Sequence, residues 1–433
     1  MKRKIISCLL VIMLAAPAMA QSSLQKNTPS GPANHGLVDW AQFQFDAAHT
    51  GYNPYEVILS PQTVGSLVLA WAAHPGFDNV WSSPTIANGM LYFGTGNNGV
   101  LYALDAQTGA YLWGASVPHS EAVGTPAVAY GNVYVAGITS EGGDVHAFFA
   151  DTGSPSWNGG DGDIPSDVTV DNSTVYVASH HFGNARYSGL YALNASSGQI
   201  VWQYYVDSGG YGATPTVANN MVYAPCDLGL CAFNASTGSV QWQFSTPEGF
   251  TFYTPAVSNG VVYAGASLSV YNEREIVWSY LYALDAATGT LLWRSPLLPT
   301  LGPAQQTVAT TTPAVANGVI YIGLGTTDPD YPVYGYMYAV DASTGRHLWQ
   351  YKATAQVSSP AVANGVVYFG TKDAAVYALD ATKGAVLWKY ITGMMAHGNN
   401  VTTSSPVIVN GMVYIGTAGW FNSNVYAFHL PKQ

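Results

Sequence analysis

Residues 102–113 read Tyr-Ala-Leu-Asp-Ala-Gln-Thr-Gly-Ala-Tyr-Leu-Trp, and related segments recur along the chain. In seven copies, the first residue and the closing tryptophan are 11 positions apart. The first residues of the copies are Tyr102, His146, Tyr191, Cys231, Tyr282, Tyr338 and Tyr377. The glycine inside each copy can adopt the left-handed conformation of a tight turn. Each copy therefore predicts two antiparallel strands joined by a hairpin.

A second hairpin precedes each copy at an equally fixed spacing. In eight units, an opening residue is followed 8 positions later by a tyrosine. The opening residues are Pro84, Pro126, Val168, Pro215, Pro255, Pro313, Pro360 and Pro406. Pairs such as Asn88-Gly89 and Asn259-Gly260 lie between opening residue and tyrosine, and they accept the positive φ angles of a type I′ turn. Each unit thus predicts four antiparallel strands, the first of them opening at the Ser/Thr-Pro step.

Units of this length with four strands are typical of a β-propeller. The last unit ends at Gln433 without a closing tryptophan, whereas Trp71 closes a strand that has no unit before it. We expect the N-terminal strand to complete the last blade, because closing the ring removes free sheet edges. The predicted fold is all-β: an eight-bladed β-propeller of four-stranded antiparallel blades, with its ring closed by the N-terminal strand.

The two tight turns of each unit lie at one end of the blade, here called the plain face. Both connections of variable length emerge at the other end, the variable face. The longest insertions occupy residues 179–189, 266–279 and 324–335 of the third, fifth and sixth units. Loops on a regular scaffold commonly carry binding and catalysis, so function is predicted on the variable face.

The composition agrees with an all-β chain and excludes electrostatic binding to nucleic acid. The chain has 48% hydrophobic residues, 46 Gly and 24 Pro, which is too apolar for disorder and too rich in turn formers for a helical protein. Charged residues make up 9%, and the formal net charge is −11. A phosphate backbone would be repelled.

The N-terminus resembles a secretory leader. Lys2, Arg3 and Lys4 precede an apolar run that ends in Ala18-Met19-Ala20. The sequence predicts a signal peptide over residues 1–20, a flexible segment over 21–38 and the propeller over 39–433. No other apolar stretch is long enough to span a membrane. We expect a periplasmic or secreted protein, monomeric and without a transmembrane span.

Three cysteines are present. Cys8 lies inside the leader, whereas Cys226 and Cys231 flank a short connection in the fourth unit. In an oxidising compartment these two are expected to form a disulfide. A metal-binding pair is the alternative, although no second Cys or His pair stands at ligand spacing.

The element at residues 102–113, with its copies at 282–293 and 377–388, resembles the repeat of pyrroloquinoline-quinone (PQQ) propellers. The resemblance extends from about Trp40 to Leu430. It implies that each repeat tryptophan docks onto the neighbouring blade. These residues are Trp71, Trp113, Trp157, Trp202, Trp242, Trp293, Trp349 and Trp388. The same repeat occurs in quinoprotein dehydrogenases and in the outer-membrane assembly lipoprotein BamB, so it favours a fold more than a function.

The dehydrogenase interpretation can be tested against the residues that the resemblance requires. Quinoprotein alcohol dehydrogenases hold PQQ and Ca²⁺ with a Glu, an Asn and an Asp, a Trp floor and a disulfide between adjacent cysteines. Here Cys226 and Cys231 are not adjacent, and no Cys-x-x-Cys-His haem motif occurs. Glu121 is a conceivable calcium ligand. The aspartates of the repeat, such as Asp105 and Asp285, are expected to bond their own turns instead.

Aromatic and histidine residues of the variable loops are the candidate ligand-binding residues. Flat rings beside polar side chains suit sugars, planar cofactors or peptide strands, and histidines can bind metals. The alternative is that the aromatic rings fill the central channel or pack loop against loop, and that the histidines are solvated. The candidates are Trp81, His119, Glu121, His180, His181, Tyr253, Trp278, His397 and Trp420.

These features favour an exported ligand-binding or protein-scaffold module that acts through its variable face. Its partner would be a small molecule, a carbohydrate or a periplasmic protein. One alternative is a PQQ- and calcium-dependent quinoprotein dehydrogenase that oxidises an alcohol or a sugar. A second is a carbohydrate-binding or carbohydrate-active propeller, which for hydrolysis needs two carboxylates across the mouth.

Overall fold

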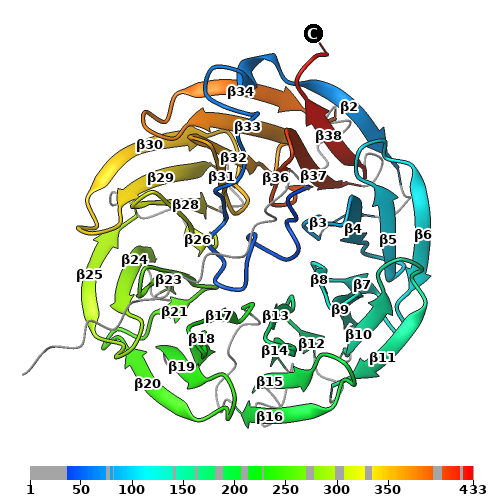
Figure 1. Ribbon diagram of the computed structural model, residues 1–433. Helices are drawn as coiled ribbons and strands as arrows, with labels where there is room; N and C mark the ends of the chain where they lie inside the picture. The colour runs from blue at the N-terminus through cyan, green and yellow to red at the C-terminus, as the bar shows by residue number, and fades with distance from the viewer. Residues whose placement is uncertain are drawn as a thin grey trace, which may run out of the picture. The chain divides into compact units, whose positions relative to one another are not determined.

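The computed structural model describes residues 37–74, 79–80, 82–139, 143–160, 164–180, 189–205, 213–226, 229–269, 277–297, 307–326, 334–393, 402–419 and 423–432. These residues belong to one compact unit, Leu37–Gln433. Its eight sheets stand in a ring around a central axis (Figure 1), which confirms the predicted eight-bladed β-propeller. No helix among the described residues is long and apolar enough to cross a membrane.

The first four blades follow the chain in order. Blade 1 contains β3 (Thr85–Ala87), β4 (Met90–Gly94), β5 (Val100–Asp105) and β6 (Tyr111–Ser116). Blade 2 contains β7 (Ala122–Val123), β8 (Ala127–Ala129), β9 (Asn132–Ile138), β10 (Val145–Phe149) and β11 (Pro155–Gly159). Blade 3 contains β12 (Ile164–Pro165), β13 (Thr169–Asp171), β14 (Thr174–His180), β15 (Gly189–Asn194) and β16 (Ile200–Tyr205). Blade 4 contains β17 (Thr216–Ala218), β18 (Met221–Cys226), β19 (Gly229–Asn234) and β20 (Val240–Ser245).

The second half of the ring repeats this pattern. Blade 5 contains β21 (Thr251–Phe252), β22 (Ala256–Ser258), β23 (Val261–Ser269), β24 (Val277–Asp285) and β25 (Leu291–Pro296). Blade 6 contains β26 (Thr307–Thr310), β27 (Ala314–Ala316), β28 (Val319–Thr326), β29 (Gly335–Asp341) and β30 (His347–Ala353). Blade 7 contains β31 (Ala361–Ala363), β32 (Val366–Gly370), β33 (Ala375–Asp380) and β34 (Val386–Ile391), and β1 (Tyr52–Asn53) pairs parallel with β31. Blade 8 contains β35 (Thr402–Thr403), β36 (Val407–Val409), β37 (Met412–Ala418) and β38 (Val425–His429).

The N-terminal strand closes the ring. β2 (Val68–Ala73), which follows the short 3-10 turn η1 (Val64–Ser66), pairs antiparallel with β38 as the outer strand of blade 8. The two strands lie side by side in Figure 1, although more than 350 residues separate them. The predicted closure is therefore confirmed.

The Asn-Gly pairs form tight turns with two left-handed residues, as predicted from their backbone preferences. Asn88 has a φ of 52° and Gly89 a φ of 75°, and the other Asn-Gly pairs repeat these values closely. Two consecutive left-handed residues match the twist of the flanking strands. The plain face is therefore a regular array of short turns.

The innermost strand differs from the prediction. In five blades it begins before the opening residue, as β7 does in blade 2, and is then interrupted near that residue, which is a proline in all of them except blade 3. Proline has no N–H to donate, so the strand cannot pair continuously there. Serine side chains add hydrogen bonds beside this position: the Ser82 hydroxyl donates to Gly94 O at 3.0 Å and accepts from Gly94 N at 2.7 Å, and that of Ser404 accepts from Gly416 N at 2.8 Å.

Tyrosine and tryptophan side chains fasten each blade to the next. In blade 1, Tyr92 Oη and Trp113 Nε1 both donate to the carbonyl of Ala150 in blade 2, each at 3.1 Å. The same double contact follows from blade 2 through blade 6. At the ends of the ring, Trp388 Nε1 donates to Leu67 O, and Trp71 Nε1 donates to Ala106 O. All eight repeat tryptophans thus contact the neighbouring blade.

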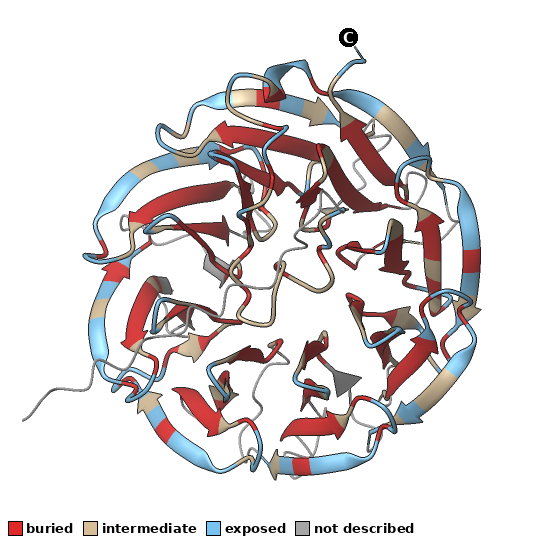
Figure 2. Cartoon of the chain, in the orientation of Figure 1, coloured by how far each residue is buried: buried red, intermediate tan, exposed pale blue. Residues whose placement is uncertain are grey.

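The turn glycines make room for these tryptophans. A Cβ atom on Gly238 would stand 2.6 Å from the Trp202 ring, and the other turn glycines lie under a tryptophan in the same way. The blade interiors between such contacts are buried, while the outermost strands are largely exposed (Figure 2). The core is therefore a series of apolar layers between successive blades.

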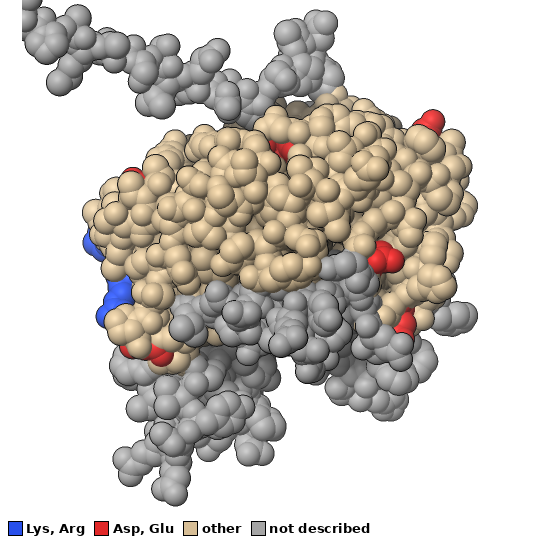
Figure 3. Space-filling view, turned by 90° about the horizontal axis from the view of Figure 1, so that it is seen from below, with Lys and Arg blue, Asp and Glu red and all other residues tan. Residues whose placement is uncertain are grey.

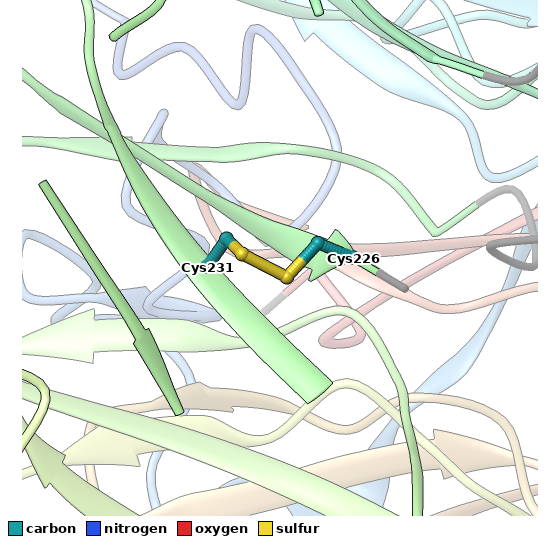
Figure 4. The surroundings of a disulfide bond; sticks show 2 residues. All are labelled: Cys226 and Cys231. Carbon is teal, nitrogen blue, oxygen red and sulfur yellow. A yellow bond between two sulfur atoms is a disulfide. The ribbon is translucent and has the colours of Figure 1, made fainter. Parts of the chain in front are cut away.

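Cys226 and Cys231 form a disulfide within blade 4, with their Cα atoms 5.8 Å apart. The bond links the paired strands β18 and β19 where they approach the variable face (Figure 4). Both residues are buried. The disulfide therefore cross-links two neighbouring strands beside this face.

Candidate functional site

The N-terminal segment Trp40–Asn53 lies in the middle of the ring, where Figure 1 shows it in dark blue. It is here called the plug. The plug passes the eight blades in order and hydrogen-bonds to the inner strand of each one. This arrangement gives the free inner edges of the blades backbone partners that they otherwise lack.

The contacts fall at one repeat position, two residues after each opening residue. Backbone N–H groups of six inner strands donate to plug carbonyls at 2.7 or 2.8 Å. The donors are Ile86, Val128, Val217, Val257, Val315 and Val362, and their acceptors are Trp40, Ala41, Ala47, Ala48, Thr50 and Gly51. In blade 3, Val170 N donates to Gln42 Oε1, and in blade 8 the Asn53 side chain donates to Ile408 O. The plug therefore occupies the channel near its plain-face end.

Left-handed residues allow the plug to turn inside the ring. Gln44, Phe45 and His49 have φ values of 55°, 77° and 53°, and Gly51 has a φ of 60°. Non-glycine residues in this region carry strain, which the surrounding contacts must offset. Gly51 is also required by space, because a Cβ atom there would stand 2.1 Å from Gln44 Oε1 and 2.8 Å from Ala314 Cβ.

His49 projects from the plug between blades 3 and 4. Its Nε2 lies 3.1 Å from Thr169 Oγ1 and its Nδ1 lies 2.8 Å from Thr216 Oγ1. The imidazole is fully buried, and burial lowers the pKa of His49 to about 3. His49 is therefore neutral at ordinary pH and joins the plug to two inner strands.

Asp46 stabilises the last turn of the plug. Its carboxylate accepts hydrogen bonds from Thr50 N at 2.9 Å and from Thr50 Oγ1 at 2.7 Å. Burial nevertheless raises the pKa of Asp46 to about 6, since it outweighs these bonds.

A ring of hydroxyl groups surrounds the channel at the residue before each opening position. The backbone N–H of one blade donates to the hydroxyl of the next, as Ser83 N does to Thr125 Oγ1 at 3.2 Å. Blade 3 carries a carboxylate instead: Thr125 N donates to Asp167 Oδ1 at 2.6 Å. Burial raises the pKa of Asp167. Asp167 thus places one acid in an otherwise uncharged ring.

Of the predicted ligand-binding residues, His119, Glu121 and Tyr253 are described with their side chains. His119 and Glu121 are exposed beside β7, on the variable side of blade 2. Tyr253 is partly buried in blade 5, and its hydroxyl lies 2.7 Å from Ser267 Oγ. Only the backbone of His180 in β14 and Trp278 in β24 is described. Trp81, His181, His397 and Trp420 lie outside the described residues.

Aromatic side chains near Tyr253 form part of the core. Phe244, Phe250, Phe252, Tyr280 and Tyr282 contact one another with ring centroids 5.2 to 6.2 Å apart. Phe250 and Phe252 are buried. These two residues therefore pack between a loop and a blade, which agrees with the alternative interpretation of the aromatic residues and not with ligand binding.

The sequence of the chain matches the model of a known protein family. A family model described as outer membrane protein assembly factor BamB, with the PQQ repeat, matches residues 69–166, 141–274 and 278–430. The chain belongs to this family. The resemblance seen in the repeat is thus confirmed for most of the propeller.

This PQQ-like chain is similar to several proteins in sequence or in structure. The tetrathionate hydrolase of Acidithiobacillus ferrooxidans is 26% identical over 274 residues, which are 61% of this chain and 47% of that protein. The match therefore spans about half of the length of that relative. Quinohemoprotein alcohol dehydrogenase ADHIIG from Pseudomonas putida HK5 superposes with a TM-score of 0.71 at 18% identity, covering 91% of this chain and 80% of that one. BamB from Moraxella catarrhalis superposes with a TM-score of 0.61 at 16% identity, covering 85% and 98%. At these identities the structures show a common fold.

The described part of this PQQ-like propeller contains no cluster of acidic ligands for a calcium-bound quinone. Glu121 is exposed, and no three side chains of His, Cys, Asp or Glu gather among the residues that the structure describes. Calcium prefers six or more oxygen ligands. We therefore derive no step through PQQ or Ca²⁺.

Sequence reasoning missed the contributions of His49 and Asp167. The signal for Asp167 was a departure from the repeat, since blade 3 has Asp167-Val168 where other blades have Ser or Thr followed by Pro. The role of His49 was missed because the plug has no periodic pattern that would place its side chain between two blades.

Proposed function

We propose that this PQQ-like propeller is a non-catalytic module that binds a ligand or a protein partner through its variable face. One observation carries the proposal: the plug occupies the channel at the plain-face end, while the strand ends that carry the connections of variable length are at the opposite end. A partner that enters along the axis would therefore meet the variable loops first. With residues 1–20 acting as an export signal, binding would take place in the periplasm or outside the cell.

Relatives supply the competing candidates. The dehydrogenase alternative would add PQQ and Ca²⁺ to the variable face, and the name of the Acidithiobacillus relative adds a hydrolase of tetrathionate. A carbohydrate-binding propeller remains within the proposal, since a sugar would be its ligand.

The test compares the mature protein with a variant in which residues 270–276 of blade 5 are replaced by a two-residue Asn-Gly turn. Both proteins are cross-linked in periplasmic extract of the source organism, and the captured partners are identified by mass spectrometry. We expect a partner captured by the mature protein to be lost from the loop variant. Lys383→Ala, in an exposed plain-face turn, is the matched control and should keep the partner.

Turnover by the purified chain would contradict the proposal. The substrates to be tried are alcohols and sugars with a dye acceptor, and tetrathionate. Capture of the same partner by the loop variant would also contradict the role of the variable face in blade 5.

A further inference from the structure

A cavity of about 290 Å³ opens on the plain face, at the seam between blade 8 and blade 1. Its walls include Ile86 of β3 and Met412 and Tyr414 of β37. Leu37, at the start of the described chain, covers one side and is 64% exposed. Asp105, at the end of β5, lies at the rim. The cavity is on the opposite side of the ring from the variable loops.

The seam forms this cavity because the chain enters there. Asn410, in the turn before β37, accepts a hydrogen bond from Val38 N and donates one to Val38 O, both at 2.9 Å. Asp39 accepts from Asn88 N at 3.0 Å in the first turn of blade 1. The entering segment is thus fixed across the two blades and acts as a wall of the cavity.

Tyr414 lacks a contact that joins most of the blades, as does Tyr368 of blade 7, whose buried hydroxyl has no partner among the described residues. In six blades the equivalent tyrosine hydroxyl donates to an alanine carbonyl of the next blade. The Tyr414 hydroxyl makes no such bond among the described residues, although the side chain is only 3% exposed and lines the cavity. A hydroxyl that lines a cavity can bond a ligand or solvent there.

Asp105 supplies a negative charge beside this hydroxyl. Its Oδ1 atom accepts all three hydrogen bonds of the turn, from Gln107 N, Thr108 N and Thr108 Oγ1. The turn bonds hold the pKa of Asp105 below its ordinary value, so the group is ionised. The second carboxylate oxygen remains available, and no Lys or Arg is among the lining residues.

The first half of the chain is much more acidic than the second. Residues 37–245, which include blades 1–4, contain 15 Asp or Glu and a single basic residue, Arg186. Residues 246–433 contain nine Asp or Glu and eight Lys or Arg. On the side of the ring shown in Figure 3, few charged residues interrupt a mostly uncharged surface. The described residues of blades 1–4 carry acidic side chains and no Lys or Arg, so a cation is favoured over an anion near blade 1.

We propose that the seam cavity binds a small organic cation, an ammonium group on an apolar body. The apolar body packs against Ile86, Met412 and the Tyr414 ring, and the ammonium group donates to Asp105 and to the Tyr414 hydroxyl oxygen. This site is independent of the variable face and of the function proposed for it.

The test uses the mature protein with its methionines labelled at the methyl carbon. Cyclohexylammonium is titrated at low salt, and the Met412 methyl signal, assigned with Met412→Leu, reports binding in the cavity. We expect cyclohexylammonium to shift this signal and to bind more tightly than cyclohexanol, which has the same shape without the charge. Added salt should weaken binding, because the carboxylate is close to solvent.

Two matched variants locate the cation. Asp105→Asn keeps the turn, since Asn194 and Asn234 make the same turn bonds in blades 3 and 4. It should weaken cyclohexylammonium binding about fivefold, the effect of losing one exposed ion pair. Asp285→Asn, in the equivalent turn of blade 5, should leave binding unchanged. Equal affinity for cyclohexanol, equal effects of the two variants, or no shift of the Met412 signal would each overturn the proposal.

Discussion

At the scale of single residues, the turn glycines show why the repeat keeps Gly beside Trp. Gly238 has a φ of 70°, and a Cβ atom there would stand 2.6 Å from the Trp202 ring. We expect Gly238→Ala to lower the free energy of unfolding by about 2–4 kcal/mol, through backbone strain and displacement of the ring. Gly249→Ala is the control: its φ is 76° but no atom lies within 4 Å, so only the strain of about 1 kcal/mol applies. Urea unfolding that finds equal losses would contradict the packing role.

The blade tyrosines allow a second comparison of the same kind. Tyr223→Phe removes a hydrogen bond to Ala286 O and leaves that buried carbonyl with one donor fewer. We expect a loss of about 1 kcal/mol in the free energy of unfolding. Tyr414→Phe should cost less, because its hydroxyl makes no bond to the next blade. A larger loss for Tyr414→Phe in urea unfolding would argue against the unpartnered hydroxyl at the seam.

His49 makes stability depend on pH. The pKa of His49 is about 3 in the folded protein and 6.5 in the unfolded chain. Below pH 6.5 the unfolded chain therefore binds a proton that the folded protein does not, and the free energy of unfolding decreases. Between pH 6.5 and 5 the contribution of His49 falls by about 2 kcal/mol, and it continues to fall towards pH 3. Asp46 acts in the opposite direction, because its pKa is raised from 3.8 to about 6.

The comparison of wild type with His49→Gln isolates this effect. We expect the wild type to lose its advantage in free energy of unfolding as the pH falls from 7 to 4, measured by urea unfolding at each pH. His119→Gln, at an exposed position, serves as the control. A difference between wild type and His49→Gln that stays constant over this range would contradict a buried neutral imidazole.

At the scale of elements, the plug connects blades that do not touch one another. Six inner-strand amides donate to its carbonyls, among them Val128, Val217 and Val315. We expect these amides to exchange slowly with solvent deuterium in the mature protein. In a variant lacking residues 37–53 but keeping β2, they should exchange faster, while amides between β18 and β19 in blade 4 should change little. Unchanged protection of the inner strands would show that the plug is not their partner.

The elements differ in how far the sequence could predict them. Asn88-Gly89 and the 11-residue spacing to Trp113 specify local turns and strands, so the blades could be predicted from short-range preferences. The plug could not, because most of its bonds are made by backbone groups to strands far away in the sequence, as between Gly51 O and Val362 N, and its own sequence follows no periodic pattern. The early start of the inner strand was missed because the Ser/Thr-Pro step predicts a strand whose first residue is the proline. In the structure the proline lies where the strand is interrupted. On the variable face, Tyr253 had a partner in Ser267 that no sequence spacing indicated.

At the scale of the whole molecule, the ring depends on joining its two ends. β2 supplies the outer strand of blade 8, and Trp71 from β2 bonds Ala106 in blade 1. We expect deletion of residues 39–71 to abolish cooperative unfolding, because blade 8 loses its outer strand and the inner strands lose the plug. Thermal unfolding followed by circular dichroism measures this. An unchanged transition would contradict closure by the N-terminal strand.

The central claim is that the variable face binds without catalysis. Calorimetric titration of the mature protein with PQQ, with and without Ca²⁺, followed by dye reduction with alcohols and sugars, tests it most directly. We predict no calcium-dependent binding of PQQ and no dye reduction. Calcium-dependent binding accompanied by dye reduction would contradict the claim and identify the chain as a quinoprotein dehydrogenase.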